Sequence, residues 1–220
     1  MVLCLVPPGE DHCASDASHL NQFYHVECEL RGKLDDGIRV MEQFVFAVTQ
    51  IIWEKSRQVI ESIVEDTSHI QELLEHSSND TAFPRVRLEE AIRILSRTAL
   101  MEQYGGMVWV THMDHLSVPF YQAYTDDSCT KARCADLMGI GETGGLGERH
   151  ITPGQVSFAL KQHEIPVESY PWYLDIREEV EMQTVGWGMG TERYLLWLLK
   201  HDDIRDMCIL PRLKGTKFLP

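Results

Sequence analysis

The 220-residue sequence predicts an α+β fold in which helices flank an antiparallel β-sheet. Predicted strands outnumber predicted helices and do not alternate regularly with them, which argues against a parallel, doubly wound sheet. The length and the 44% hydrophobic content are sufficient for one core, and the chain contains no repeat, low-complexity tract or linker. We therefore predict a single domain over residues 1–220.

The first part of the chain predicts a strand followed by helices. Residues 23–32 (FYHVECELRG) alternate as in a strand and place Glu27 and Glu29 on one face. Between residues 37 and 75, apolar residues recur at helical spacing, which predicts one long amphipathic helix or two consecutive ones. Farther along, the sequence predicts a short helix at 87–96 and strands at 105–113 and 118–125.

The second half predicts further strands and helices. Residues 131–150 (KARCADLMGIGETGGLGERH) predict two strands that meet at a glycine-rich bend. A helix should follow Thr152, because a threonine cap before Pro153 is a favourable helix start. Another helix should begin near Gly190, and residues 204–212 (IRDMCILPR) predict a last strand.

The composition favours a small-molecule partner. A formal charge of −14 and a pI of about 5.1 argue against tight, nonspecific nucleic-acid binding, since that binding depends on Lys and Arg side chains neutralising phosphates. No apolar run approaches the roughly 20 residues that span a bilayer, and the opening MVLCLVPP lacks the basic start of a signal peptide. We therefore expect a cytoplasmic protein without a membrane partner.

The six cysteines are scattered and form no C-x-x-C pair, so we expect mainly reduced thiols. The alternative is metal binding at His12 and Cys13, or at Cys129 and Cys134, although neither pair has a matching second pair.

Residues 111–116 (THMDHL) offer a second set of polar side chains. His112, Asp114 and His115 are suitable metal ligands or a proton-transfer pair. We favour a structural turn for this segment.

A glycine-rich segment, GWGMGTER, occupies residues 186–193 and has glycine at every second position before Arg193. Glycines that lead into a helix expose backbone N–H groups at its positive end, and an arginine in the first turn adds a directed charge. This combination suits a phosphate. The alternative is that the glycines only admit a neighbouring strand and that Arg193 pairs with an acidic surface.

The segment also resembles the third signature motif of class II aminoacyl-tRNA synthetases, G-x-G-x-G-x-E-R. Further segments resemble this family in the right order, and the resemblance covers nearly the whole chain. The nearest members are the asparaginyl- and aspartyl-tRNA synthetases and the related archaeal asparagine synthetase. The matching segments are SHLNQFYHVECEL (end of motif 2), FPRVRLEEAIRIL, PFY and ADLMGIGETGGLGER.

The resemblance implies a site for ATP and Mg²⁺. Arg193 would hold the terminal phosphate of ATP beside the backbone of Gly188 and Gly190. Asp136 and Glu142 would be the carboxylates that bind the metal, and hard oxygen ligands suit Mg²⁺. We expect Arg193 and Glu142 to be the catalytic residues. The alternative for the two acids is solvated charge at strand ends.

The resemblance also implies an amino-acid site formed by Arg149 and Glu27. An arginine favours a carboxylate or an amide oxygen, whereas an acid accepts from an amide NH₂ group and repels a carboxylate. Together they indicate an aspartate- or asparagine-like substrate and leave the choice between the two open. The alternative for Arg149 is an ion pair with Glu148 or another neighbour.

The sequence departs from the family in motif 2. The arginine that neutralises the α-phosphate of ATP falls at Glu10, the family acid falls at His12, and the arginine before the histidine becomes Ser18. An acid near the α-phosphate opposes adenylation. Motif 1, which builds the family's dimer interface, and the anticodon-binding barrel would precede residue 1; a homodimer is nevertheless compatible with the resemblance.

These observations support three hypotheses. The first is an ATP-dependent ligase of the asparagine synthetase or asparaginyl-tRNA synthetase type, which activates the carboxylate of an aspartate- or asparagine-like amino acid for amide formation. The second is a non-adenylating relative that binds such an amino acid as a regulator or as an ATP-independent enzyme. Aminoacylation of tRNA ranks last, because of the acidic charge and the missing barrel.

Overall fold

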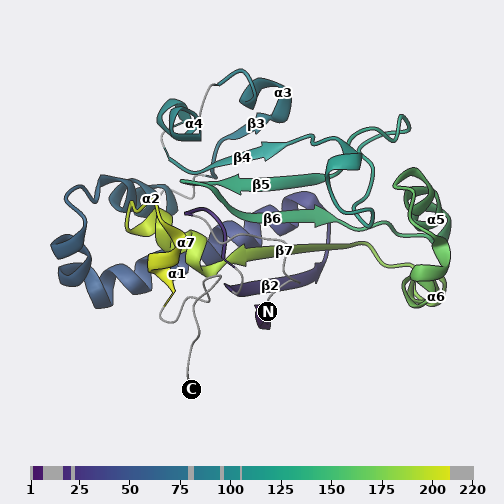
Figure 1. The fold of residues 1–220 in the computed structure, drawn as a ribbon, viewed down its shortest axis with the longest axis horizontal. Coiled ribbons are helices and arrows are strands. Elements are labelled where there is room, and N and C mark those ends of the chain that lie inside the picture. The colour runs from purple at the N-terminus through teal and green to yellow at the C-terminus, as the bar shows by residue number, and fades with distance from the viewer. Residues whose placement is uncertain are drawn as a thin grey trace.

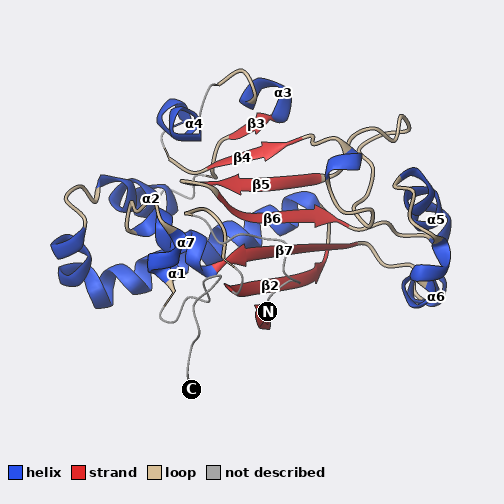
Figure 2. Ribbon diagram, viewed as in Figure 1, coloured by secondary structure: helices blue, strands red, loops and turns tan. Residues whose placement is uncertain are grey.

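A seven-stranded sheet forms the centre of the molecule (Figures 1 and 2). The structure is a computed structural model that describes residues 2–6, 17–20, 23–78, 82–94, 97–104 and 106–208. The strand order is β1-β2-β7-β6-β5-β4-β3, and every neighbouring pair is antiparallel except β3 and β4. The strands are β1 Val2–Val6, β2 Phe23–Arg31, β3 Arg85–Arg87, β4 Val108–Thr111, β5 Cys134–Met138, β6 Glu142–Glu148 and β7 Thr184–Gly190.

Helices surround this sheet, which confirms the predicted α+β class. Helix α1 lies behind the central strands, and α5 and α6 lie together at the opposite end of the sheet from α2 and α7 (Figure 1). None of the helices in the described ranges is both long and apolar enough to cross a membrane. The helices are α1 Leu34–Ile63, α2 Ser68–Ser78, α3 Leu88–Ala91, α4 Arg97–Tyr104, α5 Pro153–Gln162, α6 Pro171–Glu179 and α7 Thr191–Leu198, with 3₁₀ turns η1 His115–Ser117, η2 Val167–Ser169 and η3 Ile204–Met207.

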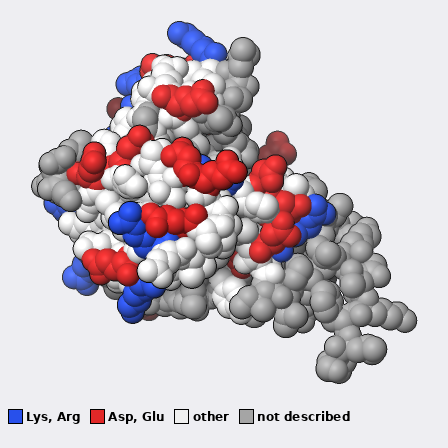
Figure 3. Space-filling view, turned by 90° about the vertical axis from the view of Figure 1, so that its left-hand side faces the viewer, with Lys and Arg blue, Asp and Glu red and all other residues white. Residues whose placement is uncertain are grey.

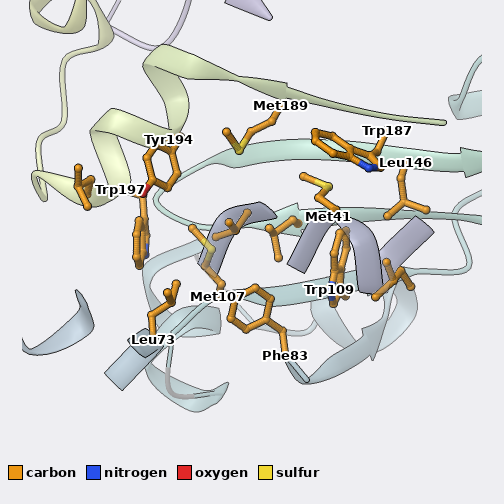
Figure 4. Packing of buried hydrophobic residues seen from close by; sticks show 14 of the residues in the cluster. Met41, Leu73, Phe83, Met107, Trp109, Leu146, Trp187, Met189, Tyr194 and Trp197 are labelled. Carbon is orange, nitrogen blue, oxygen red and sulfur yellow. The ribbon is translucent and has the colours of Figure 1, made fainter. Parts of the chain in front are cut away.

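The main core lies between α1 and the back of β5, β6 and β7. Ile38, Met41 and Val45 recur at helical spacing on α1 and are buried completely or almost so. Figure 4 shows Met41 between Trp109 and the side chains of Leu146 and Trp187. The apolar stripe of α1 thus covers one face of the central strands and leaves their other face free of this helix.

One acid is buried within this core. The Glu42 carboxylate accepts hydrogen bonds from the Trp109 indole N–H at 2.8 Å and from the Phe83 backbone N–H at 3.1 Å. Burial raises the pKa of Glu42, while these two hydrogen bonds act in the opposite direction. The acid therefore ties α1 to β4 and to the segment before β3.

Most predicted elements are confirmed, with shifted bounds. The region 37–75 forms two helices, α1 and α2, and the cap at Thr152 is a full capping box with Gln155. The helix predicted at 87–96 is only the single turn α3 after a short strand, and residues 95–96 lie outside the described ranges.

Two predicted strands are wrong where the structure describes them. Residues 118–125 form turns and isolated bridges, because Pro119 cannot donate a ladder hydrogen bond and the backbone N–H of Ala123 reaches across to Glu148. Residues 204–207 form η3, started by the Asp203 side chain, which accepts from the Arg205 N–H. Residues 209–212 of that prediction lie outside the described ranges.

The packing of α1 against β6 predicts a sharp cost for a side chain at Gly144. A Cβ atom there would collide with the Met41 methyl group and lie 2.6 Å from the backbone oxygen of Gly188. We expect Gly144→Ala to lower the free energy of unfolding in urea by about 1–3 kcal/mol. Gly154→Ala is the matched control, because its nearest neighbour would be 3.9 Å away at Thr152 Oγ1, and it should be neutral or slightly stabilising within α5. Equal stability of the two variants would contradict this packing.

Candidate functional site

A long cleft lies over β6 and β7 on the face opposite to α1. It consists of two adjoining cavities of about 330 and 630 Å³, which share His25, Glu142, Gly145 and Gly188. The smaller cavity, here the α7 cavity, reaches the start of α7 and is also lined by Arg193. The larger, here the β2 cavity, also contains the other predicted site side chains, which are Asp136, Arg149 and Glu27.

Glycines form the floor of this cleft. Alternate positions of the two strands carry no side chain on this face: Gly145 and Gly147 on β6, and Gly186, Gly188 and Gly190 on β7. Since side chains alternate between the two faces of a strand, the residues between these glycines point to the core. The glycine pattern of the sequence is therefore a strand pattern, and its last glycine caps α7.

The strand register places one row of site residues across four strands. Glu27 pairs with Gly188, Gly188 with Gly145, and Gly145 with Asp136. At about 4.8 Å per strand, the backbones of Glu27 and Asp136 are roughly 14 Å apart. The two acids thus lie on opposite sides of a glycine floor.

The floor glycines also make room for the side chains beside them. A Cβ atom on Gly188 would overlap the His25 ring, and one on Gly186 would overlap both the Glu29 carboxylate and the Arg149 guanidinium. A Cβ on Gly147 would lie 2.6 Å from the Gln122 side-chain amide carbon. At each of these three positions a Cβ atom would force a neighbouring side chain to move.

Arg193 borders the α7 cavity from the first turn of α7. Its guanidinium donates to the Ser18 backbone oxygen at 3.2 Å, and none of the residues described here forms an ion pair with it. The preceding Glu192 is buried and accepts from the Tyr24 N–H with both oxygens at 3.1 Å, which fixes α7 against β2. The predicted alternative, an Arg193 pairing with an acidic surface, is not seen within the described ranges.

Asp136 and Glu142 approach each other above Gly145. A Cβ atom on Gly145 would lie 3.0 Å from Asp136 Oδ1 and 3.6 Å from Glu142 Oε1. Burial, with a further contribution from the Glu142 charge, raises the pKa of Asp136 to about 7. The two acids therefore form a pair of neighbouring carboxyl groups that is suited to a cation.

Arg149 lies at the far end of the β2 cavity and is held by an acid and a ring. Its Nη2 and Nε atoms donate to the two Glu29 oxygens at 2.9 and 3.2 Å, and its guanidinium lies 4.8 Å from the centre of the Tyr121 ring. Glu148 instead accepts from Arg133 at 3.0 Å. The alternative predicted for Arg149, an ion pair with Glu148 or another neighbour, is therefore observed, with Glu29 as the partner in place of Glu148.

Glu27 faces the same cavity and is paired with a histidine. His25 Nδ1 lies 3.0 Å from Glu27 Oε1, and half of the Glu27 side chain is exposed. Since His25, Glu27 and Glu29 alternate along β2, all three lie on the cleft face.

The structure thus brings the predicted site residues to one cleft. These are Arg193, Glu142, Asp136, Arg149, Glu27, Gly188 and Gly190. Sequence reasoning placed Glu29 on the face of Glu27 but gave it no role, and it gave no role to His25 or Tyr121. The i, i+2 spacing on a strand was the signal for His25 and Glu29. Glu10 and His12 lie outside the described ranges.

The other candidate ligands are involved in structural contacts. His115 is buried, donates through Nε2 to the Gln122 carbonyl at 2.7 Å and accepts at Nδ1 from His163 at 2.9 Å. His112 has a positive φ of 61°, as expected of the favoured turn. Cys129 and Cys134 are free thiols, and no group of three or more His, Cys, Asp or Glu side chains in the described ranges could hold a metal ion.

The surface charge is mixed on the face seen in Figure 3. Asp and Glu side chains gather in clusters between separate Lys and Arg side chains on this end of the molecule, where α1 and α2 lie. This pattern agrees with the formal charge of −14 and differs from the broad basic surface of a nonspecific nucleic-acid binder.

Comparison with known proteins places the chain in one family. A sequence model described as tRNA synthetases class II (D, K and N) matches residues 10–214. The asparagine–tRNA ligase of Chloroflexus aurantiacus is 25% identical over 96% of this chain and 52% of its own length, and that of Koribacter versatilis is 25% identical over 86% and 47%. The chain therefore spans about half the length of the curated relatives it matches.

Solved structures share the fold. Asparaginyl-tRNA synthetase from Pyrococcus horikoshii complexed with asparaginyl-adenylate has a TM-score of 0.86 at 24% identity, over 99% of this chain and 53% of that one. Aspartyl-tRNA synthetase from Entamoeba histolytica has a TM-score of 0.79 at 15% identity, over 98% and 48%. The predicted class II synthetase core is confirmed.

The raised pKa of Asp136 predicts a stability effect with a definite sign. Between about pH 4 and 7 the folded chain keeps a proton on Asp136 that the unfolded chain has lost. The free energy of unfolding therefore has its full contribution from this proton below about pH 4 and loses that contribution as the pH rises to about 7. We expect Asp136→Asn to raise the free energy of unfolding by about 1–3 kcal/mol at pH 8 and much less at pH 5, measured in urea.

Asp66→Asn is the control with the opposite sign. The hydrogen bond from Lys200 lowers the pKa of Asp66, so its carboxylate contributes stability at pH 8 that the asparagine cannot replace. If Asp136→Asn and the unsubstituted chain have equal free energies of unfolding at pH 8, the folded structure does not disfavour the charged form of Asp136.

Proposed function

Because the chain belongs to the class II tRNA synthetases of the D, K and N type, we propose that it binds Mg-ATP and an aspartate- or asparagine-like amino acid in the cleft and activates the amino acid's carboxylate. The observation that carries this proposal is that cationic and acidic side chains from β2, β5, β6 and α7 share one glycine-floored cleft. The two ligands would lie end to end, with the nucleotide toward α7.

The nucleotide would occupy the α7 cavity. Arg193 is a guanidinium without an acidic partner among the described residues, and it lies in the first turn of a helix whose start lines the cavity and has a positive dipole end. A phosphate there would receive charge-assisted hydrogen bonds. The absence of side chains at Gly188 and Gly190 would let the nucleotide lie directly on the backbone.

Asp136 and Glu142 fit a magnesium ion that arrives with the nucleotide. Their carboxylates converge over Gly145, and a divalent cation would offset the burial and the Glu142 repulsion that together raise the pKa of Asp136. Two carboxylates with further oxygens from phosphate and water are a common Mg²⁺ ligand set. When bound, the ion would neutralise phosphate charge as it develops.

The amino acid would occupy the β2 cavity, with its side chain at Arg149. Glu29 already accepts from two guanidinium N–H groups of Arg149, and Glu27 adds another negative charge nearby. A second carboxylate would meet both acids, whereas an amide could accept from Arg149 and donate to an acid. This arrangement favours an asparagine-like over an aspartate-like side chain.

The acceptor of the activated carboxylate distinguishes the possible outcomes. Transfer of an activated aspartate side chain to ammonia or another small nucleophile would make the chain a ligase of the asparagine synthetase type, whereas an asparagine-like substrate has only its α-carboxylate to activate. Transfer to tRNA is the activity that the names of the curated relatives state for those proteins. For this chain we place tRNA second, because its charge of −14 disfavours a polyanion.

A second candidate function follows from Glu10, which falls where the family has the arginine for the α-phosphate. A chain that lacks this donor and does not replace it would bind the amino acid without adenylating it, and would act as a regulator or an ATP-independent enzyme. Losing one preorganised donor typically costs about 2.7–4 kcal/mol of transition-state stabilisation.

Amino-acid-dependent exchange between ATP and pyrophosphate tests the proposal. We expect exchange with asparagine or aspartate, and we expect Arg193→Gln and Glu142→Ala each to lower it by roughly 100-fold or more, because each removes a charge that faces the nucleotide. Arg57→Gln is the matched control on the exposed face of α1, where Arg57 pairs with Glu61 at 2.8 Å, and it should leave exchange unchanged.

Calorimetry separates the two candidates. Binding of both Mg-ATP and the amino acid, together with exchange, supports the ligase. Amino-acid binding without ATP binding or exchange supports the non-adenylating relative. Binding of neither would exclude both.

A further inference from the structure

A third cavity lies beyond Arg149, outside the proposed nucleotide and amino-acid cleft. It has a volume of about 350 Å³, within the usual range for small-molecule sites. It shares Glu29, Tyr121 and Arg149 with the β2 cavity, so these side chains form the wall between the two. We call it the aromatic cavity, and its lining consists of Glu29, Phe120, Tyr121, Arg149, Tyr170, Trp172, Tyr173 and Arg177.

Arg177 is a buried cation without a counter-charge. Only 6% of the residue is exposed, and no ion pair to it exists within the described ranges. Its Nη1 donates to the Met182 carbonyl at 3.2 Å and its Nη2 to the Tyr173 hydroxyl at 3.1 Å, while Nε has no partner. Both acceptors are neutral, and a buried charge without an opposite charge is costly.

A purely structural role explains only part of this arrangement. Arg177 lies in the last turn of α6, where the helix dipole favours a cation, and its bond to Met182 ties α6 to the segment before β7. A neutral residue of similar length could fill the same volume without the cost of burying a charge. The guanidinium carbon also lies 5.1 Å from the centre of the Tyr173 ring, a cation–π contact that supplies no negative charge. An anion in the adjoining cavity would supply it.

The cavity's composition defines the rest of the ligand. Its charged groups are two guanidiniums and one carboxylate, which leave a net charge of +1 and disfavour a cation. Five aromatic rings form the walls, with Phe120 packed against Tyr170 at a centroid distance of 4.7 Å and Trp172 against Tyr173 at 5.4 Å. Such walls suit a flat apolar body.

We infer that the aromatic cavity binds a small aromatic carboxylate, whose carboxylate pairs with Arg177 and whose ring packs among Tyr170, Trp172 and Tyr173. The inference does not depend on the proposed function, since it requires neither ATP nor an amino acid. The shared wall would place this ligand next to the Arg149–Glu29 pair.

Fluorine NMR of the full chain labelled with 5-fluorotryptophan tests the inference, with phenylacetate as the probe. Trp172 is 57% exposed and lines the cavity, and Trp172→Phe assigns its resonance among the five tryptophans. We expect phenylacetate to shift the Trp172 resonance in a saturable way. Neutral phenylacetamide, of nearly the same shape, should bind at least tenfold more weakly. No saturable shift, or equal affinity for acid and amide, would overturn the inference.

Arg177→Met provides the second arm, because methionine keeps much of the side-chain length and removes the charge. It should weaken phenylacetate binding at least tenfold and leave phenylacetamide unchanged. Lys161→Met removes the same charge from an exposed position on α5 away from the cavity and should change neither. If Arg177→Met and Lys161→Met weaken phenylacetate binding equally, the effect comes from the overall charge of the chain and the inference is wrong. If Arg177→Met does not fold, the comparison of acid and amide on the unsubstituted chain still decides.

Discussion

The candidate site depends on the absence of side chains on one face of two central strands. Strands β6 and β7 carry glycine at alternate positions, and charged side chains of β2, β5 and α7 fill or border the space above. Gly145 admits the Asp136 and Glu142 carboxylates, and Gly186 admits the Arg149–Glu29 pair. A Cβ atom at Gly186 would displace the Arg149–Glu29 pair, and one at Gly145 would press on the Asp136 carboxylate.

The opposite face of the same strands offsets the cost of this arrangement. Glycine weakens a strand, because it loses more chain entropy on folding and offers no side chain for packing. Between the glycines, Leu146, Val185, Trp187 and Met189 point toward α1 and are almost completely buried. The two strands thus place their large apolar side chains on the core face and their alternate glycines on the cleft face.

The sequence predicted the α+β class, and the residues proposed for the site lie in one cleft, because the glycine motif and the family resemblance are local patterns. It did not predict the strand 184–190, whose glycines we interpreted as an approach to a helix. Long-range contacts were also missed. The Arg149 partner, Glu29, is 120 residues away, and only the register of β2, β7 and β6 brings the two together. The strand expected at 118–125 fails because Pro119 and cross-sheet hydrogen bonds override its alternating pattern.

The central claim is that a nucleotide and a small amino acid share this one cleft. The most direct measurement is a crystal structure of the chain with Mg²⁺, a non-hydrolysable ATP analogue and asparagine. The account predicts a phosphate within hydrogen-bond distance of Arg193, a metal ion between the phosphates and the Asp136 and Glu142 carboxylates, and the asparagine side chain at Arg149. A nucleotide bound outside the cleft would contradict the account. So would an amino acid bound away from Arg149 in a crystal where nothing blocks the cleft.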